Sequence, residues 1–165
     1  MSITYLKRGK PDVERAEDDA KTRQVVEATL ADVAANGDTA VRALSEKFDG
    51  YSPTTFRLTE AEIADLIAQL TPRELADIKF AQEQVRNFAQ AQRDSMLDIE
   101  VETLPGVILG HKNIPVQSVG CYVPGGKFPM VASAHMSVAT ASVAGVPRII
   151  ASTPPFQGKP NPGVI

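Results

Sequence analysis

The residues best suited to chemistry follow one apolar run, residues 116–123. Tyr122 stands near the end of this run, and Pro124-Gly125-Gly126 comes directly after it. A proline ends a strand, and two glycines allow positive φ and a close approach of the backbone to a ligand. Where such a loop leads into a helix, free N–H groups can meet a pyrophosphate or a carboxylate. The spacing is not G-x-G-x-x-G, so a plain turn is an equal alternative.

Tyr122 is the aromatic residue closest to this loop. Ligands of open α/β sheets bind outside the carboxyl ends of the strands, which is where this residue is expected to lie. Its ring could stack on a nucleotide, or its hydroxyl could donate to one. The residue types alone favour the alternative, a half-buried packing tyrosine with its hydroxyl in water.

Two polar residues in the small-residue segment after the loop are further candidates for contact with a substrate. Ser133 could present its hydroxyl to a ligand, although capping of a helix is the commoner role for a serine at such a position. His135 could also contact a substrate, but a partly buried structural histidine is the favoured interpretation. We therefore rank both below Tyr122, Gly125 and Gly126.

The other reactive side chains do not form a recognisable catalytic set, so no catalytic or metal-binding residue is assigned. Neither His111 nor His135 has an acid or a cysteine at metal-ligand spacing. Glu100 and Glu102 alternate with apolar residues and are interpreted as solvated charges on a strand. Cys121 is expected to be buried in a strand and unreactive.

The elements that position these residues come in two parts. Residues 12 to about 95 have helical patterns, with stop signals at Asn36-Gly37 and Asp49-Gly50, a possible cap at Asp38, and two capping boxes. The capping boxes pair Thr59 with Glu62 and Thr71 with Glu74. From about residue 97 the pattern changes to short strands.

Residues 99–103 alternate apolar and polar, and residues 107–109 form a return strand after Leu104-Pro105-Gly106, which predicts a hairpin. Strand 116–123, a helix of small residues and strand 149–151 then predict a βαβ unit. The predicted fold class is α/β, with a helical N-terminal segment, 1–96, followed by a β-hairpin and an incomplete Rossmann-like α/β region, 97–165.

Composition excludes several classes of function. The formal net charge is −3 with no basic face, so nucleic acid is not an expected partner. No stretch reads as a signal peptide or a membrane span, and the single cysteine favours a reducing compartment, so we expect a cytoplasmic protein.

The chain resembles the histidinol dehydrogenase family from about Asp19 onward. The matching stretches are Asn36-Gly37-Asp38-Thr39-Ala40-Val41, Lys47-Phe48-Asp49-Gly50, Val119-Gly120-Cys121-Tyr122-Val123-Pro124-Gly125-Gly126, Met136, Val143-Ala144-Gly145-Val146 and Thr153-Pro154-Pro155. The resemblance implies a zinc enzyme that uses NAD to oxidise a small primary alcohol through an aldehyde to a carboxylate, and that works as a homodimer.

The resemblance also implies roles for individual residues. Tyr122 matches the family's NAD-contacting tyrosine, and Gly125 and Gly126 lie at the same strand end. The family's zinc ligands and its Glu-His acid/base pair would fall beyond Ile165, so this chain is expected to be an N-terminal portion that is inactive by itself.

Two departures resemble a paralogous branch that includes sulfopropanediol dehydrogenase: His135 replaces an aliphatic residue, and Thr140 replaces a common proline. The substrate therefore stays open between L-histidinol and an alcohol such as sulfopropanediol. The alternative function is a catalytically inactive interaction module that uses its helices and an exposed sheet edge.

Overall fold

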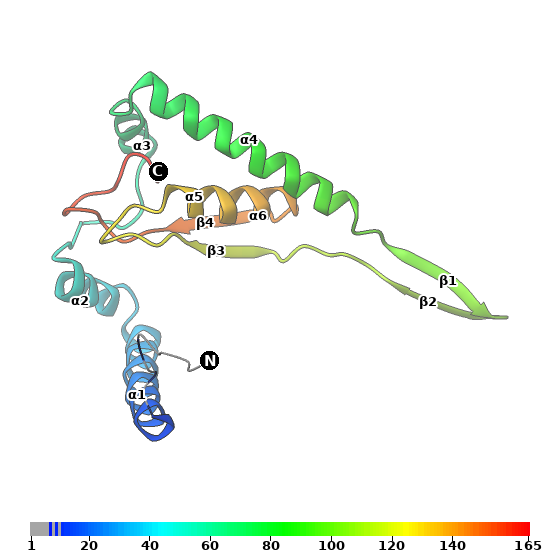
Figure 1. Ribbon diagram of the computed structural model, residues 1–165, viewed down its shortest axis with the longest axis horizontal. Coiled ribbons are helices and arrows are strands. Elements are labelled where there is room, and N and C mark those ends of the chain that lie inside the picture. Colours follow the sequence, from blue (N-terminus) through cyan, green and yellow to red (C-terminus); the bar gives the residue numbers. More distant parts are fainter. Residues whose placement is uncertain (1–6, 8, 10) are drawn as a thin grey trace, which may run out of the picture. The chain divides into compact units, whose positions relative to one another are not determined.

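A computed structural model describes residues 7, 9 and 11–165. The chain forms two compact units, and the boundary between them lies between Ser52 and Pro53 (Figure 1). Among the helices of the described residues, none has the length and apolarity that crossing a membrane requires.

The first unit consists of two helices in contact, α1 (Asp12–Asn36) and α2 (Asp38–Asp49). Gly37 ends α1 with φ 53°, and its N–H donates to the Val33 carbonyl. Gly50 ends α2 in the left-handed conformation that glycine favours. Both predicted stop signals are confirmed. The predicted cap at Asp38 is wrong, because Gly37 occupies the N-cap and Asp38 is already in the first turn, where its carboxylate meets the positive end of the helix dipole.

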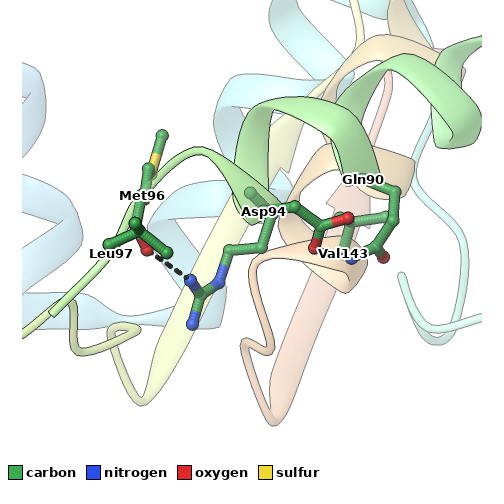
Figure 2. A pocket seen from close by; sticks show the side chains of 6 residues that line it. Gln90, Asp94, Met96, Leu97 and Val143 are labelled. Atoms are coloured by element: carbon green, nitrogen blue, oxygen red, sulfur yellow. Dashed lines mark hydrogen bonds between the residues drawn. The ribbon is translucent and has the colours of Figure 1, made fainter.

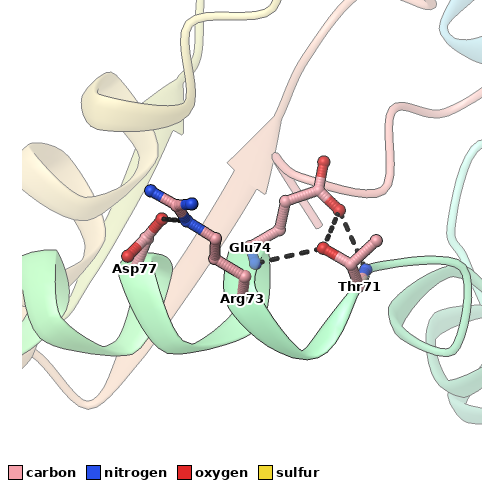
Figure 3. Close-up of polar contacts among 4 residues, drawn as sticks. All are labelled: Thr71, Arg73, Glu74 and Asp77. Atoms are coloured by element: carbon pink, nitrogen blue, oxygen red, sulfur yellow. Dashed lines mark hydrogen bonds and ion pairs between the residues drawn. The ribbon is translucent and has the colours of Figure 1, made fainter.

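The second unit begins with α3 (Glu60–Ile67) and α4 (Pro72–Asp94). Both predicted capping boxes are confirmed. Figure 3 shows the one at α4, where Thr71 Oγ1 accepts from the Glu74 N–H at 3.2 Å and the Glu74 carboxylate accepts from the Thr71 N–H at 2.8 Å. The hydrogen bonds from the Thr71 hydroxyl and N–H lower the pKa of Glu74.

A β-hairpin follows α4. Strand β1 (Ile99–Leu104) pairs antiparallel with β2 (Val107–His111), and Gly106 in the turn between them has φ 80°. At the base of the hairpin, Asp98 Oδ1 accepts from the Asn113 N–H at 2.9 Å and from the Asn113 side-chain amide at 3.2 Å. These bonds lower the pKa of Asp98 and tie the two strands together where they leave the helical part.

The last part of the second unit is a βαβ unit. Strand β3 (Ser118–Tyr122) runs parallel to β4 (Arg148–Ser152), with Gly120 opposite Ile150 and Tyr122 opposite Ser152. The connection is helical: α5 (Val131–Ala134), a π-helical turn η1 (His135–Ala139) and α6 (Thr140–Val143). This helical connection lies between α4 and the two strands (Figure 1), and η1 contacts both α4 and β3.

The structure confirms the predicted α/β class and the predicted order of a helical segment, a hairpin and a βαβ unit. The helical pattern ends at Asp94 and the first strand begins at Ile99, close to the predicted change at residue 96. The contact of α4 with η1 and α6 places α4 in the same compact unit as β3 and β4. A division into domains at residue 96 stays a prediction.

The core of the second unit is small. Its buried residues among those described are Ala89, Cys121, Val123, His135 and Ala139. They come from α4, from the end of β3 and from η1, which explains why the π-helical turn is held against both neighbours. The predicted burial of Cys121 is confirmed.

Candidate functional site

Tyr122 is the last residue of β3 and its side chain is 66% exposed. Its neighbours Cys121 and Val123 are buried, because successive side chains of a strand point to opposite faces and these two face the helical connection. Tyr122 is thus exposed and not half-buried. Its ring is open to a ligand, in contrast to the packing role that the residue types alone favoured.

The chain after Tyr122 forms a closed loop, residues 124–130. The Met130 N–H donates to the Pro124 carbonyl at 3.3 Å, and the Lys127 N–H donates to the Gly125 carbonyl at 3.0 Å. Gly126 has φ 82°, a conformation that L side chains rarely adopt, and nothing lies within 4 Å of the position of a Cβ atom there. The loop therefore needs Gly126 for its backbone conformation, and its surface at Gly126 is open.

Gly125 is needed for a different reason. A Cβ atom at this position would lie 3.2 Å from Cγ of Pro154 and 3.2 Å from Oγ1 of Thr153. The sequence predicted a close approach of this backbone to a ligand, but its close neighbour in the structure is the chain's own segment after β4. The two glycines thus have separate tasks, packing for Gly125 and a positive φ for Gly126.

The carboxyl ends of β3 and β4 meet at this loop. The Val123 N–H donates to the Ser152 carbonyl at 2.8 Å, which extends the parallel ladder one residue beyond β3. Thr153 and Pro154 consequently lie beside Gly125. Sequence reasoning did not assign these two residues to the site, although the parallel pairing of the two strands is the signal that could have found them.

Ser133 lies one turn into the helical connection and is half-buried. Its N–H donates to the Met130 carbonyl at 2.9 Å, and Met130 occupies the N-cap of α5. The capping role that the sequence favoured for Ser133 is therefore wrong. Its carbonyl accepts from the Ser137 hydroxyl at 2.7 Å, so the backbone of Ser133 takes part in the π-helical turn that follows.

His135 is the first residue of η1 and is buried, with 7% of its surface exposed. Burial lowers the pKa of the imidazole, because a charged ring loses its hydration there. The structure thus separates the sequence candidates: Tyr122, Gly125 and Gly126 belong to one stretch at the end of β3, and His135 is part of the buried core.

The π-helical turn was not predicted. Two hydroxyl groups of this segment donate back to carbonyls of the preceding turn, a pattern that competes with regular helical bonding. Ser137 Oγ donates to the carbonyls of Ser133 and Ala134, and Thr140 Oγ1 donates to those of Met136 and Ser137. Small hydroxyl residues in this segment were the available signal.

One open hollow lies at the other end of the helical connection (Figure 2). It is lined by Gln90, Arg93, Asp94, Met96, Leu97 and Val143. Its polar groups are already engaged: Arg93 Nη1 donates to the Met96 carbonyl at 3.4 Å, and Gln90 Nε2 donates to Asp94 Oδ1 at 2.7 Å. This hollow is formed by the end of α4 and α6, so it does not include the glycine loop.

The described part of the chain contains no group of three or more histidine, cysteine, aspartate or glutamate side chains able to hold a metal ion. The donor set that zinc requires is therefore not assembled by these residues.

A model of the histidinol dehydrogenase family matches residues 13–165. The chain belongs to the histidinol dehydrogenase family. A histidinol dehydrogenase homolog of Shouchella clausii is 54% identical over 155 residues, which are 94% of this chain and 37% of the relative. A sulfopropanediol 3-dehydrogenase of Ruegeria pomeroyi is 42% identical over 158 residues, 96% of this chain and 36% of the relative.

The crystal structure of histidinol dehydrogenase from Elizabethkingia anophelis has the same fold over 97% of this chain, with a TM-score of 0.79 at 24% sequence identity. This chain covers 34% of that structure. It spans about a third of the length of the curated histidinol dehydrogenase relatives, with shares of 37% and 36% for the two described above. The coverage therefore does not by itself assign the activity of a complete family member to this chain.

Proposed function

We propose that this chain supplies the NAD-binding loop of a histidinol dehydrogenase-type oxidoreductase, a cytoplasmic homodimer that also uses zinc. In this reaction a small primary alcohol would be oxidised to an aldehyde and then, with an oxygen atom from water, to a carboxylate, and NAD would be used twice, accepting one hydride in each step. Tyr122 contacts the cofactor, and the backbone of Gly125 and Gly126 borders it. The substrate is L-histidinol or a related alcohol such as sulfopropanediol.

The observation that carries this proposal is the exposed ring of Tyr122 beside a constrained glycine loop at the carboxyl end of a parallel strand. Ligands of open α/β sheets bind at this end of the strands. The loop is held by the Met130 to Pro124 hydrogen bond and by the fit of Gly125 against Pro154. A preformed loop loses little conformational entropy when a ligand binds, which favours a binding role.

Ser133 and His135 have lesser parts in this proposal. Ser133 is half-buried one helical turn beyond the loop, close enough in the chain to border a substrate. His135 is buried in η1, so we assign it a structural role in the core. No residue of this chain is assigned to proton transfer or to zinc. We therefore expect the chain alone not to oxidise L-histidinol or sulfopropanediol.

Calorimetric titration of the purified chain with NAD tests the proposal. We expect the unaltered chain to bind NAD. Tyr122→Ala should weaken this binding, and Tyr122→Phe should largely keep it because the aromatic ring is retained. Phe80→Ala is a matched control, because Phe80 on α4 is 65% exposed and Tyr122 is 66% exposed. Absence of NAD binding by the unaltered chain, or equal effects of Tyr122→Ala and Phe80→Ala, would contradict the proposal.

A second function, an interaction module without catalysis, is favoured by the β1–β2 hairpin. Ile99, Val101 and Leu109 lie on one face of this two-stranded sheet and are each at least half exposed. An apolar sheet face left open is suited to association. This function would be supported by self-association that increases with concentration in a chain that does not bind NAD. Leu109→Glu should abolish this self-association, and Ile108→Glu, on the opposite face of the hairpin, should leave it intact.

A further inference from the structure

The tip of the loop after β3 carries an exposed aromatic side chain. Phe128 is 75% exposed, whereas Val123, just before the loop, is 1% exposed. Tyr122 and Met130, at the two ends of the same stretch, are also exposed. Three large, mostly apolar side chains of residues 122–130 therefore lie open to solvent, although each would gain free energy from being covered.

The backbone that carries Phe128 is constrained on both sides. Before it, Gly126 holds a positive φ and the Lys127 N–H donates to the Gly125 carbonyl. After it, Pro129 restricts the backbone of Phe128 to extended conformations. The Met130 to Pro124 hydrogen bond closes the loop. Phe128 is thus presented to solvent on a loop of defined shape, and little backbone entropy would be lost on binding.

We propose that Phe128 is a second ring-binding residue of this site and stacks on one of the two heteroaromatic rings of a dinucleotide. This assignment rests on the function proposed above and deepens it. An aromatic face stacks on any planar base, since the attraction comes from the ring faces and from the exclusion of water between them. The ring of Tyr122 and that of Phe128 then contact different parts of one ligand.

The test compares Phe128→Ala, Phe128→Leu and Phe128→Tyr by calorimetric titration of the full 165-residue chain. The probes are NAD, AMP, NMN and ribose 5-phosphate. We expect Phe128→Ala to weaken NAD binding about tenfold, the size of effect typical for loss of one stacked base. Phe128→Leu loses most of the same affinity, and Phe128→Tyr keeps it.

The probes identify the stacked ring. Phe128→Ala should weaken the binding of either AMP or NMN by the same factor as it weakens the binding of NAD. Binding of ribose 5-phosphate, which has no aromatic ring to stack, should not change. Loss of affinity for ribose 5-phosphate as well would mean that Phe128 only maintains the loop, and it would overturn the assignment.

Phe88→Ala is the matched control, because Phe88 lies on α4 and is 68% exposed. Circular dichroism establishes that each variant folds, which we expect because both side chains are largely solvated. Unchanged NAD binding in Phe128→Ala overturns this assignment and leaves the proposed function standing. An equal loss in Phe88→Ala also overturns the assignment. Failure of the unaltered chain to bind NAD overturns the proposed function and this assignment together.

Discussion

Gly125 lies directly against Pro154: a Cβ atom on Gly125 would be 3.2 Å from Cγ of the proline ring. This contact joins the loop after β3 to the segment after β4, and it shapes the end of the sheet where Tyr122 is exposed. Because 3.2 Å is tighter than ordinary van der Waals contact, a methyl group at Gly125 would require the side chains of Pro154 and Thr153 to shift by a few tenths of an ångström.

The first prediction concerns this contact. Gly125→Ala should lower the free energy of unfolding, by about 1 to 3 kcal/mol if the effect resembles overpacking elsewhere. Combining it with Pro154→Ala, which removes the Cγ atom, should cost less than the sum of the two single changes. Urea unfolding of the four proteins measures this coupling. Strictly additive costs would show that Gly125 and Pro154 do not interact.

The second prediction concerns the backbone of Gly126. An alanine there would have to adopt φ near 82°, so Gly126→Ala should cost about 1 to 2 kcal/mol of stability. Gly120→Ala is the control, since Gly120 is in β3, has no positive φ and has nothing within 4 Å of its Cβ position. The control should be neutral or slightly stabilising. A larger loss in Gly120→Ala than in Gly126→Ala would refute this account of the loop.

The third prediction is a dependence of stability on pH that comes from His135. Burial lowers the folded-state pKa of this imidazole below its usual 6.5, so the unfolded chain binds a proton more readily than the folded chain does. The titration of His135 should therefore leave the free energy of unfolding unchanged above about pH 6.5, and the free energy of unfolding should fall as the pH drops below that value.

Measuring the free energy of unfolding of His135→Gln from pH 7.5 to 5 tests this prediction. The variant should be less stable than the unaltered chain at every pH, and it should lose the part of the pH dependence that comes from His135. His111→Gln, at an exposed position in β2, serves as the control. If the unaltered chain and His135→Gln show parallel pH profiles, the burial of His135 does not control this dependence.

The fourth prediction concerns the start of α4. Thr71→Ala removes the hydroxyl that accepts from the Glu74 N–H and should lower stability by about 1 kcal/mol. The pKa of Glu74 is lowered in the folded chain, so its contribution is present above the unfolded value of 4.5 and is lost as the pH falls through the folded value. Thermal unfolding at pH 7 and at low pH measures both effects.

Arg73→Ala provides the comparison for α4. Arg73 Nε and Asp77 Oδ2 are 3.8 Å apart and both side chains are largely exposed (Figure 3). Their ion pair should therefore contribute little to the free energy of unfolding. A loss in Arg73→Ala as large as that in Thr71→Ala would contradict the capping argument.

Local signals in the sequence were reliable where one short stretch decides the structure. Gly37 and Gly50 end helices because a glycine can take the conformation that a helix end requires. The capping boxes at Thr59 and Thr71 formed because both partners lie within one helical turn. Asp38 shows the limit of such signals: Gly37, directly before it, took the N-cap, and Asp38 became the first helical residue.

The candidate site was predicted less completely. Tyr122, Gly125 and Gly126 stand together in the sequence and meet at one loop, so their proximity needed no tertiary information. Their part in binding stays a prediction. The capping role favoured for Ser133 did not hold, because the helix begins earlier, at Val131, with Met130 as its N-cap. For His135 the sequence favoured a partly buried structural histidine over a contact with substrate, and the structure buries this residue.

By itself, the sequence determined the order of helices and strands, the ends of most of them and the position of the glycine loop, since each depends on residues close together in the chain. Only the tertiary structure decided that Gly125 packs on Pro154 and that Tyr122 and Phe128 are exposed. These features depend on the parallel pairing of β3 with β4 and on the packing of η1 between α4 and β3. Contacts between distant segments set them, and no local pattern encodes such contacts.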